Sequence, residues 1–303
     1  MRIVIMGSGG LGGLFGGLLA KAGAAVIFIA RGDHLQAMQT SGLKILSQTG
    51  DVALPSVHAF DDPTGESIAD FVIFTVKGAD TRAACELIAP IVGPKTGIIC
   101  FQNGIEGIDI LADRYGKGAV IPGATFVPAM IEKPGVIRHL GAGSQTTVGE
   151  WNGEMSNRLK AFATLAKKAG LDVSVSDDIH PVVWGKFVAF ATFSALTSLT
   201  RLPLRTIGTT PETLQLAFDA MAEVIAVADA RGIKIPPQVF DDTKEFVQNV
   251  DPAWKTSMAN DLAAGKAIES DSISGSVHRL GQELGVPTPI NTVFYRALKP
   301  FAA

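Results

Sequence analysis

The 303-residue sequence is poor in the residues that build disulfide and metal sites. It has two cysteines, Cys85 and Cys100, which are too few for a disulfide framework or a cysteine zinc site. Its five histidines show no metal-ligand spacing, and the sequence has neither a Walker A motif nor a G-x-S-x-G elbow. We therefore expect no metal site, and a reducing cytoplasm is the simplest location for the protein.

An excess of charge of one sign is also missing. The chain has 26 basic and 29 acidic side chains, a net charge of -3, whereas binding to nucleic acid or to a membrane surface requires a strong positive excess. The uncharged run 3–20 contains seven glycines, which suit neither a signal peptide nor a membrane anchor, and the run 187–200 is too short to span a bilayer. We expect neither nucleic acid nor a membrane as a partner.

Glycine is abundant but unevenly distributed, with 25 of the 33 in residues 1–153 and eight in the remainder. Glycine is disfavoured inside helices, so this imbalance predicts a loop-rich α/β first half and a mostly helical second half. We place the domain boundary at about residue 178.

Short apolar, β-branched segments recur in the first half and are separated by stretches long enough for helices. This alternation predicts an α/β fold with a doubly wound parallel sheet. The expected strands are 2–6, 25–30, 71–76, 97–101 and 120–124, with a hairpin-like insertion at 42–47 and 52–60. Segments 136–140 and 146–149 are expected to be antiparallel strands at the sheet edge, followed by a helix at 156–168 and a strand at 172–176.

The sequence pattern of the second half predicts only helices, most of which begin near a proline or a turn. The expected helices are 181–199, 211–231, 236–249, 252–264, 266–284 and 289–298.

A G-x-G-x-x-G motif follows the first expected strand and opens an apolar helix. Its residues are Gly7, Ser8, Gly9, Gly10, Leu11 and Gly12. The first glycine permits a tight turn, the second admits a pyrophosphate, and the third allows the helix to pack closely on the strand. The motif in this context predicts dinucleotide binding at the helix N-terminus.

The end of the second expected strand bears on the choice of dinucleotide. Arg31 stands where NAD-binding proteins often carry an acidic residue, and a guanidinium fits a 2′-phosphate, so NADP is favoured. Asp33 lies nearby and keeps an NAD interpretation open. Lys77 and Asn103 follow two further strands at the edge of the sheet where ligands bind.

One charged residue interrupts the long apolar stretch of the second half. Lys186 is the only charge between Pro181 and Thr200, and it either extends towards solvent or serves a function. Glu269 follows a break in the helical pattern, where a glutamate is commonly a solvated residue.

Taken together, these residues resemble the ketopantoate reductase (2-dehydropantoate 2-reductase) family over nearly the whole chain. The resemblance rests on Gly7–Gly12, Arg31-Gly32, Lys77, Gln102-Asn103-Gly104, Gly123-Ala124-Thr125, Trp184-x-Lys186, Ser257-Met258, Glu269-x-Asp271 and Gly285-x-Pro287-x-Pro289. It implies an NADP-binding Rossmann-type domain at 1–178 and an all-helical substrate and catalytic domain at 179–303. The implied reaction is NADPH-dependent reduction of a 2-oxo acid in a cleft between the domains.

The resemblance also implies roles for individual residues. Lys186 matches the catalytic lysine, which binds the substrate oxygen and donates a proton to it. Asn103 positions nicotinamide and substrate, and Glu269 lies near the cofactor and the lysine. Ser257 and Ser194 are the implied substrate contacts, and Ala129 supplies a backbone contact to the cofactor.

Some positions depart from the family pattern. Phe190, Ser194 and Leu204 stand where the family commonly has asparagines that hold the substrate. A phenylalanine cannot hydrogen-bond a hydroxyl, and a polar group that loses its hydrogen bond in a buried site costs about 1–3 kcal/mol.

These departures leave three hypotheses. The first is reduction of ketopantoate for pantothenate and coenzyme A synthesis, and the second is the same chemistry on a more apolar 2-oxo acid. The third is a non-catalytic NADP(H)-binding sensor or regulator. The apolar faces of the helical half would suit a core or a homodimer equally well.

Overall fold

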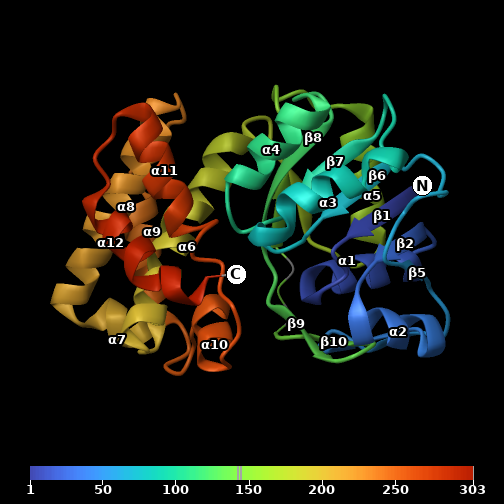
Figure 1. The fold of residues 1–303 in the computed structure, drawn as a ribbon, viewed down its shortest axis with the longest axis horizontal. Coiled ribbons are helices and arrows are strands. Elements are labelled where there is room, and N and C mark those ends of the chain that lie inside the picture. Colours follow the sequence, from blue (N-terminus) through green and yellow to red (C-terminus); the bar gives the residue numbers. More distant parts are fainter. Residues whose placement is uncertain (142, 144, 303) are drawn as a thin grey trace. The chain divides into compact units, whose positions relative to one another are not determined.

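The structure is a computed structural model that describes residues 1–141, 143 and 145–302. Its residues form two compact units, the first drawn mainly in blue and green and the second mainly in yellow to red (Figure 1). The first unit contains Met1–Gln102 and Gly107–Ile179. The second contains the chain from His180 onward together with Asn103–Glu106. Four residues from the first half of the sequence therefore pack with the second unit.

An eight-stranded sheet forms the centre of the first unit, in the order β12-β11-β8-β7-β6-β1-β2-β5. Its strands are β1 (Arg2–Met6), β2 (Ala25–Ile29), β5 (His58–Phe60), β6 (Phe71–Phe74), β7 (Gly97–Cys100), β8 (Val120–Phe126), β11 (Gln145–Val148) and β12 (Val173–Val175). From β5 to β8 neighbouring strands are parallel, and in chain order they follow the Rossmann pattern 3-2-1-4-5-6. The predicted fold class is confirmed. The strand order reverses between β1 and β6, which is where such sheets bind ligands.

A second, four-stranded sheet has the order β4-β3-β10-β9. Its strands are β3 (Leu43–Ser47), β4 (Val52–Leu54), β9 (Ala129–Lys133) and β10 (Val136–His139). The expected hairpin is present as β3 and β4, but β5 leaves it and pairs in parallel with β2. The expectation that 136–140 lies at the edge of the main sheet was wrong, because β10 pairs with β3 and β9. Strand β9 was missed because its side chains are exposed or half-buried and give no alternating apolar pattern.

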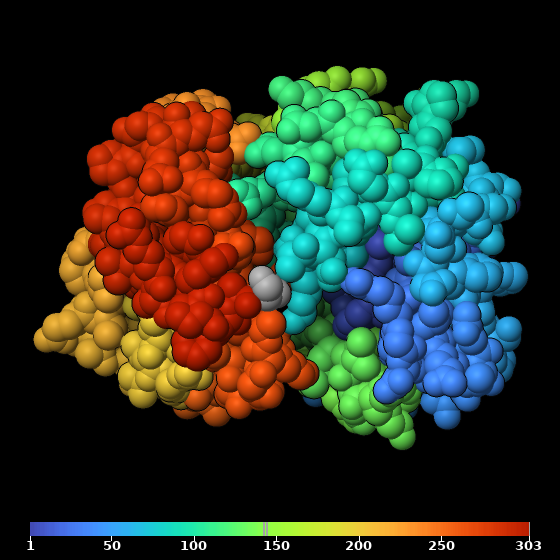
Figure 2. All heavy atoms as spheres, in the orientation of Figure 1, coloured from blue at the N-terminus to red at the C-terminus, as the bar shows by residue number. Residues whose placement is uncertain are grey.

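Helices pack against the main sheet. They are α1 (Gly10–Lys21), α2 (Gly32–Ser41), α3 (Thr81–Leu87), α4 (Glu106–Tyr115) and α5 (Asn157–Lys168), with the short 3-10 helices η1 (Gly78–Asp80) and η2 (Ala89–Ile91). The side chain of Ser156 caps α5 by accepting a hydrogen bond from the backbone amide of Leu159. In the space-filling view, the green side chains of β9 and β10 adjoin the blue side chains of α2 (Figure 2).

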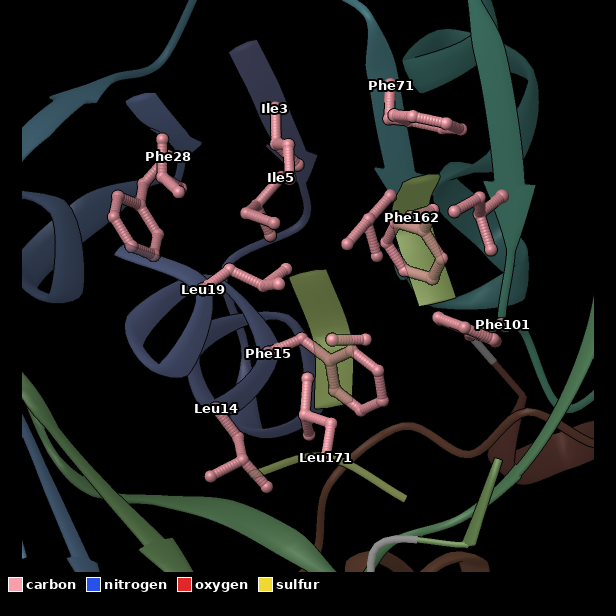
Figure 3. Packing of buried hydrophobic residues seen from close by; sticks show 14 of the residues in the cluster. Ile3, Ile5, Leu14, Phe15, Leu19, Phe28, Phe71, Phe101, Phe162 and Leu171 are labelled. Atoms are coloured by element: carbon pink, nitrogen blue, oxygen red, sulfur yellow. The ribbon is translucent and has the colours of Figure 1, made fainter. Parts of the chain in front are cut away.

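The core of the first unit lies between the sheet and helices α1 and α5. Phe15 of α1 contacts Phe101 just after β7, with ring centroids 5.1 Å apart (Figure 3). Phe71 of β6 contacts Phe162 of α5 at 5.3 Å. All four rings are almost completely buried, and burial of such a side chain contributes about 2 kcal/mol. This packing fixes the carboxyl ends of the strands from which the site residues extend.

The second unit is helical. Its helices are α6 (Ile179–Thr200), α7 (Leu204–Thr209), α8 (Pro211–Ala230), α9 (Val239–Asn249), α10 (Ser257–Ala263), α11 (Ser274–Leu284) and α12 (Pro289–Leu298), followed by η3 (Lys299–Phe301). By length and composition α6 could cross a membrane, but 67% of its most apolar window is buried inside the protein. We therefore interpret α6 as a helix largely buried in the protein interior.

Several predicted helix boundaries needed correction. The expected helix 266–284 was too long, because α11 begins only at Ser274 and residues 266–273, which include Glu269, lie outside a helix. Helices α9 and α10 start at Val239 and Ser257, later than expected. Pro181 lies inside the first turn of α6, where a missing amide is tolerated.

Candidate active site

The G-x-G-x-x-G residues form a tight turn between β1 and α1. Gly7 has a φ of 97°, a conformation that favours glycine. The amides of Gly7 and Ser8 donate to the carbonyl oxygen of Ile29 at 3.3 and 2.9 Å. The turn is thus fixed to the end of β2 before α1 begins at Gly10.

The three glycines of the motif have different surroundings. A Cβ atom on Gly12 would lie 2.2 Å from the carbonyl oxygen of Gly7, so this position requires glycine for close packing. A Cβ atom on Gly7 would lie 2.8 Å from the amide nitrogen of Val76. A Cβ atom on Gly9, in contrast, would meet nothing within 4 Å. The space at Gly9 leaves the backbone open to close approach by a phosphate.

The N-terminus of α1 supplies donors for such a phosphate. The first hydrogen bond of the helical ladder runs from the amide of Gly13 to the carbonyl of Gly9 at 2.7 Å, so the amides of Gly10, Leu11 and Gly12 have no acceptor within the helix. Ser8 is 2% exposed, and its hydroxyl has no hydrogen-bond partner among the described residues. These donors and the open space at Gly9 fit the pyrophosphate of a dinucleotide.

Two neighbouring segments complete this turn. Thr75, just after β6, donates its hydroxyl to the carbonyl of Gly7 at 2.8 Å. A Cβ atom on Gly10 would lie 2.3 Å from the carbonyl oxygen of Ala129, so the backbone of Ala129 lies directly against the start of α1. The structure therefore brings Ala129 to the predicted cofactor turn. Thr75 was missed, and the only available signal was a polar residue at the end of a strand.

Arg31 lies at the N-terminal cap of α2, directly beyond β2, and Asp33 lies in the first turn of that helix. The Arg31 guanidinium is exposed and contacts the carboxylate of Asp80 in η1 at 2.8 Å. Lys77 precedes η1 and is also exposed. Arg31 and Lys77 thus follow β2 and β6, the two strands that flank β1 in the main sheet. Asp80 was not predicted from the sequence, and its negative charge would compete with a 2′-phosphate for Arg31.

In the second unit, Lys186 and Asn103 lie together. The Nζ atom of Lys186 donates to Oδ1 of Asn103 at 3.1 Å. Lys186 belongs to α6, whereas Asn103 follows β7 in the chain and packs with the helices. The same ammonium lies 5.7 Å from the ring centroid of Phe190, one turn along α6. A half-buried ammonium therefore has an amide oxygen on one side and an aromatic face on another.

The remaining predicted residues of this unit differ in accessibility. Glu269 is half-buried in the loop before α11, and its carbonyl accepts the amide of Ile273 at 3.1 Å. Ser257 is exposed as the first residue of α10. Ser194 is fully buried, and its hydroxyl has no hydrogen-bond partner among the described residues. The Lys186 ammonium thus contacts the side chains of Asn103 and Phe190.

Two hydrogen bonds that were not predicted from the sequence hold the chain just before Asn103. The side-chain amide of Gln102 donates to the carbonyl of Val76 at 2.9 Å and to the hydroxyl of Thr81 at 2.8 Å. It ties the end of β7 to the segment that follows β6. Gln102 was noted only as part of a resemblance, and an isolated glutamine carries no signal for such a role.

The fold and these residues define an oxidoreductase whose first unit is a nucleotide-binding domain of the Rossmann type. The first unit has the phosphate-binding turn at the point where the strand order reverses. The second unit has a lysine ammonium that could donate a proton to a reacting oxygen.

Comparison with known proteins agrees with this class. The family model "Ketopantoate reductase PanE/ApbA" matches residues 3–153, and its C-terminal counterpart matches residues 178–302. A 2-dehydropantoate 2-reductase of Mesorhizobium japonicum is 31% identical over 95% of this chain and 94% of its own. The solved structure of 2-dehydropantoate 2-reductase from Geobacter metallireducens has a TM-score of 0.91 at 30% identity and covers 99% of both chains.

The chain belongs to the ketopantoate reductase PanE/ApbA family. It is an oxidoreductase acting on a CH–OH group, and its reaction is the reduction of a 2-oxo acid. A D-mandelate dehydrogenase solved with NADH and anilino(oxo)acetate also shares the fold, with a TM-score of 0.91 and coverage of 99% of this chain and 98% of its own. That protein is 22% identical, so the likeness concerns the fold alone.

Proposed function

We propose that the enzyme uses NADPH to reduce 2-dehydropantoate to pantoate, the 2-hydroxy acid of pantothenate and coenzyme A synthesis, in the cytoplasm. The observation that carries this proposal is the contact between Lys186 and Asn103 at 3.1 Å. It joins a lysine ammonium, the proposed proton donor, to an amide in a family whose reaction is 2-oxo acid reduction.

Residues of the first domain, 1–178, would hold the cofactor. The α1 amides and the Ser8 hydroxyl would bind its pyrophosphate, with Ala129 beside them. Arg31 would bind the 2′-phosphate and Lys77 a further phosphate or adenosine-side group, which favours NADP over NAD. When bound, the reduced nicotinamide supplies a hydride to the substrate carbonyl carbon.

Lys186, in the second domain at 179–303, would donate the proton that completes the reaction. A lysine is ordinarily protonated near pH 7, so its ammonium can hydrogen-bond the carbonyl oxygen and stabilise the negative charge that develops there. The Asn103 oxygen accepts a hydrogen bond from one of the three N–H groups of this ammonium, which orients the other two N–H groups.

Other residues of the second unit would assist. The Asn103 amide nitrogen remains a donor for nicotinamide or substrate, because its oxygen faces Lys186. Glu269 would act near the cofactor and the lysine, and Ser257 is exposed and available to a substrate carboxylate. Ser194 would serve the substrate as a buried hydroxyl that still lacks a partner among the described residues.

A second candidate is the same reaction on a more apolar 2-oxo acid. The ring of Phe190 lies 5.7 Å from the Lys186 ammonium and presents an apolar face beside the proposed proton donor. Leu204 is almost fully buried at the start of α7. Neither side chain could hydrogen-bond a substrate hydroxyl, so a substrate with an apolar side chain would lose nothing by contacting Phe190.

A panel of 2-oxo acids distinguishes the candidates. The purified protein is mixed with NADPH and with ketopantoate, pyruvate, 2-oxoisovalerate or phenylglyoxylate, and loss of NADPH absorbance is followed. The highest kcat/KM with ketopantoate would support the first proposal, and the highest value with phenylglyoxylate or 2-oxoisovalerate would support the second. NADPH binding without turnover of any 2-oxo acid would contradict both.

A further inference from the structure

Asn103 belongs to a short segment, Asn103–Glu106, that packs with the helical unit. Asn103 contacts Lys186, and a Cβ atom on Gly104 would lie 2.7 Å from the carbonyl oxygen of Ser272. Ile105 is 3% exposed. Glu106 follows and begins α4. The position of the Asn103 amide thus depends on how this four-residue segment is held.

Arg279 of α11 holds the end of that segment. Its Nε atom donates to Oε1 of Glu106 at 2.9 Å, and its Nη2 atom donates to Oε2 at 2.7 Å. This is the bidentate arrangement that a guanidinium forms with a carboxylate and that a lysine cannot reproduce. Hydrogen bonding to Glu106 raises the pKa of Arg279 above its ordinary value, so the guanidinium stays charged.

The same guanidinium also holds the loop that carries Glu269. Its Nη2 atom donates to the carbonyl of Asp271 at 2.8 Å, and its Nη1 atom lies 3.7 Å from the Asp271 carboxylate. Lys299 donates to that carboxylate at 2.9 Å. Burial alone would raise the pKa of Asp271, but the contacts with Lys299 and Arg279 outweigh it and lower the pKa. Asp271 therefore remains an anion at neutral pH.

We infer that Arg279 is a positioning residue of the reaction. One guanidinium fixes Glu106, three residues from Asn103, and Asp271, two residues from Glu269. It thereby sets the position of both groups relative to Lys186. A displacement of about 1 Å in such groups can reduce turnover about 100-fold. This inference rests on the proposed roles of Asn103 and Glu269.

The test compares Arg279→Gln and Arg279→Lys with a matched control, Arg114→Gln. Arg114 of α4 makes a similar pair with Glu86 through its Nε atom, at 3.1 and 3.2 Å, but belongs to the first unit. We expect Arg279→Gln to lower kcat about tenfold or more, Arg279→Lys to recover part of the loss, and Arg114→Gln to leave kcat unchanged. The Kd of NADPH should stay within about twofold in all three, because Arg279 belongs to the other unit and Arg114 pairs with Glu86 rather than with the phosphate-binding residues.

A readout independent of activity separates this inference from the proposed function. Amide hydrogen exchange of peptides covering residues 103–106 should become faster in Arg279→Gln and stay unchanged in Arg114→Gln. Unchanged exchange in Arg279→Gln overturns the inference, whichever substrate the enzyme uses. If the wild-type enzyme reduces no 2-oxo acid, the proposed function fails, and the exchange result still decides whether Arg279 holds the segment. A kcat loss that matches only the unfolded fraction would also contradict a positioning role.

Discussion

The Nζ atom of Lys186 lies 3.1 Å from the Oδ1 atom of Asn103, although 83 positions separate the two residues in the chain. The contact joins the middle of the apolar helix α6 to a segment that follows a strand of the Rossmann-type sheet. An ammonium in such a place loses part of its hydration, and the amide oxygen replaces some of it.

Removal of the ammonium should abolish most of the turnover. We expect Lys186→Ala to lower kcat about 100-fold or more, the size typical for loss of a general acid. The Kd of NADPH should change little, because the phosphate-binding residues belong to the first unit. Initial rates with the best 2-oxo acid and titration of NADPH fluorescence measure the two quantities. Equal loss of cofactor binding and turnover would contradict the role of Lys186 as proton donor.

Substitution of two glycines in the phosphate-binding turn should have different effects, on NADPH binding at Gly9 and on stability at Gly12. Gly9→Ala places its methyl group in open space, so we expect an unchanged Tm but NADPH binding weakened about tenfold or more. Gly12→Ala forces a methyl group against the carbonyl of Gly7, so we expect a loss of about 1–3 kcal/mol of stability. Thermal unfolding and NADPH titration of both variants test this. A Tm reduced equally in both would show that Gly9 is needed for packing.

Arg31 should decide the choice between the two dinucleotides. Arg31→Ala should raise the KM for NADPH much more than that for NADH, because only NADPH carries the 2′-phosphate. Asp80→Asn is the reciprocal change, since it frees the guanidinium from its carboxylate and should lower the KM for NADPH. The exposed pair itself contributes little to stability, so neither variant should shift the Tm. Equal changes for the two cofactors would contradict the NADP assignment.

Phe190 should control the selection of the 2-oxo acid. Phe190→Asn adds a hydrogen-bonding amide beside Lys186, and we expect the kcat/KM ratio of ketopantoate to phenylglyoxylate to rise about tenfold. Phe190→Leu keeps an apolar side chain and serves as the matched control, with a much smaller change in that ratio. The same ratio in wild type and Phe190→Asn would show that this side chain does not face the substrate.

Glu150 should make the stability of the first unit depend on pH. It is 5% exposed and accepts hydrogen bonds from Arg158 and Ser156. Burial would raise its pKa, but these two contacts outweigh burial and lower the pKa from the ordinary value of 4.5. The stabilisation is therefore present above pH 4.5 and is lost as pH falls through the lower, folded-state pKa.

Replacement of this carboxylate is the direct test. Glu150→Gln should lose about 1–3 kcal/mol at neutral pH, because Arg158 keeps its charge without a carboxylate partner. The difference from wild type should shrink in acid, where wild-type Glu150 is protonated as well. Urea unfolding at several pH values measures both. A difference in unfolding free energy between the two proteins that does not shrink at low pH would contradict the predicted role of Glu150 ionisation.

The sequence could predict the Rossmann-type sheet because its central parallel strands are short apolar runs, as in β6 and β7. It could not predict β9, whose side chains are mostly exposed, nor the departure of β5 from the hairpin, which is fixed by pairing with β2. The glycine turn followed from local spacing. The contact between Lys186 and Asn103 was not predicted, because the family resemblance implied a role for each residue and no local pattern relates residues so far apart.

The partners of Arg31 and Arg279 show the same limit. Asp80 and Glu106 are acidic residues near helix starts, and in sequence such residues look like ordinary solvated charges. Their roles depend on which guanidinium lies opposite, and that is determined by tertiary packing.

The membership of Asn103–Glu106 in the helical unit has a consequence for domain exchange. A chimera joined near residue 178 would take Lys186 and Arg279 from one parent but Asn103 and Glu106 from the other. Its lysine would meet a foreign amide, and its arginine a foreign carboxylate. Transplanting the specificity of a relative onto this chain therefore requires two grafts, the C-terminal helices and the four-residue segment after β7.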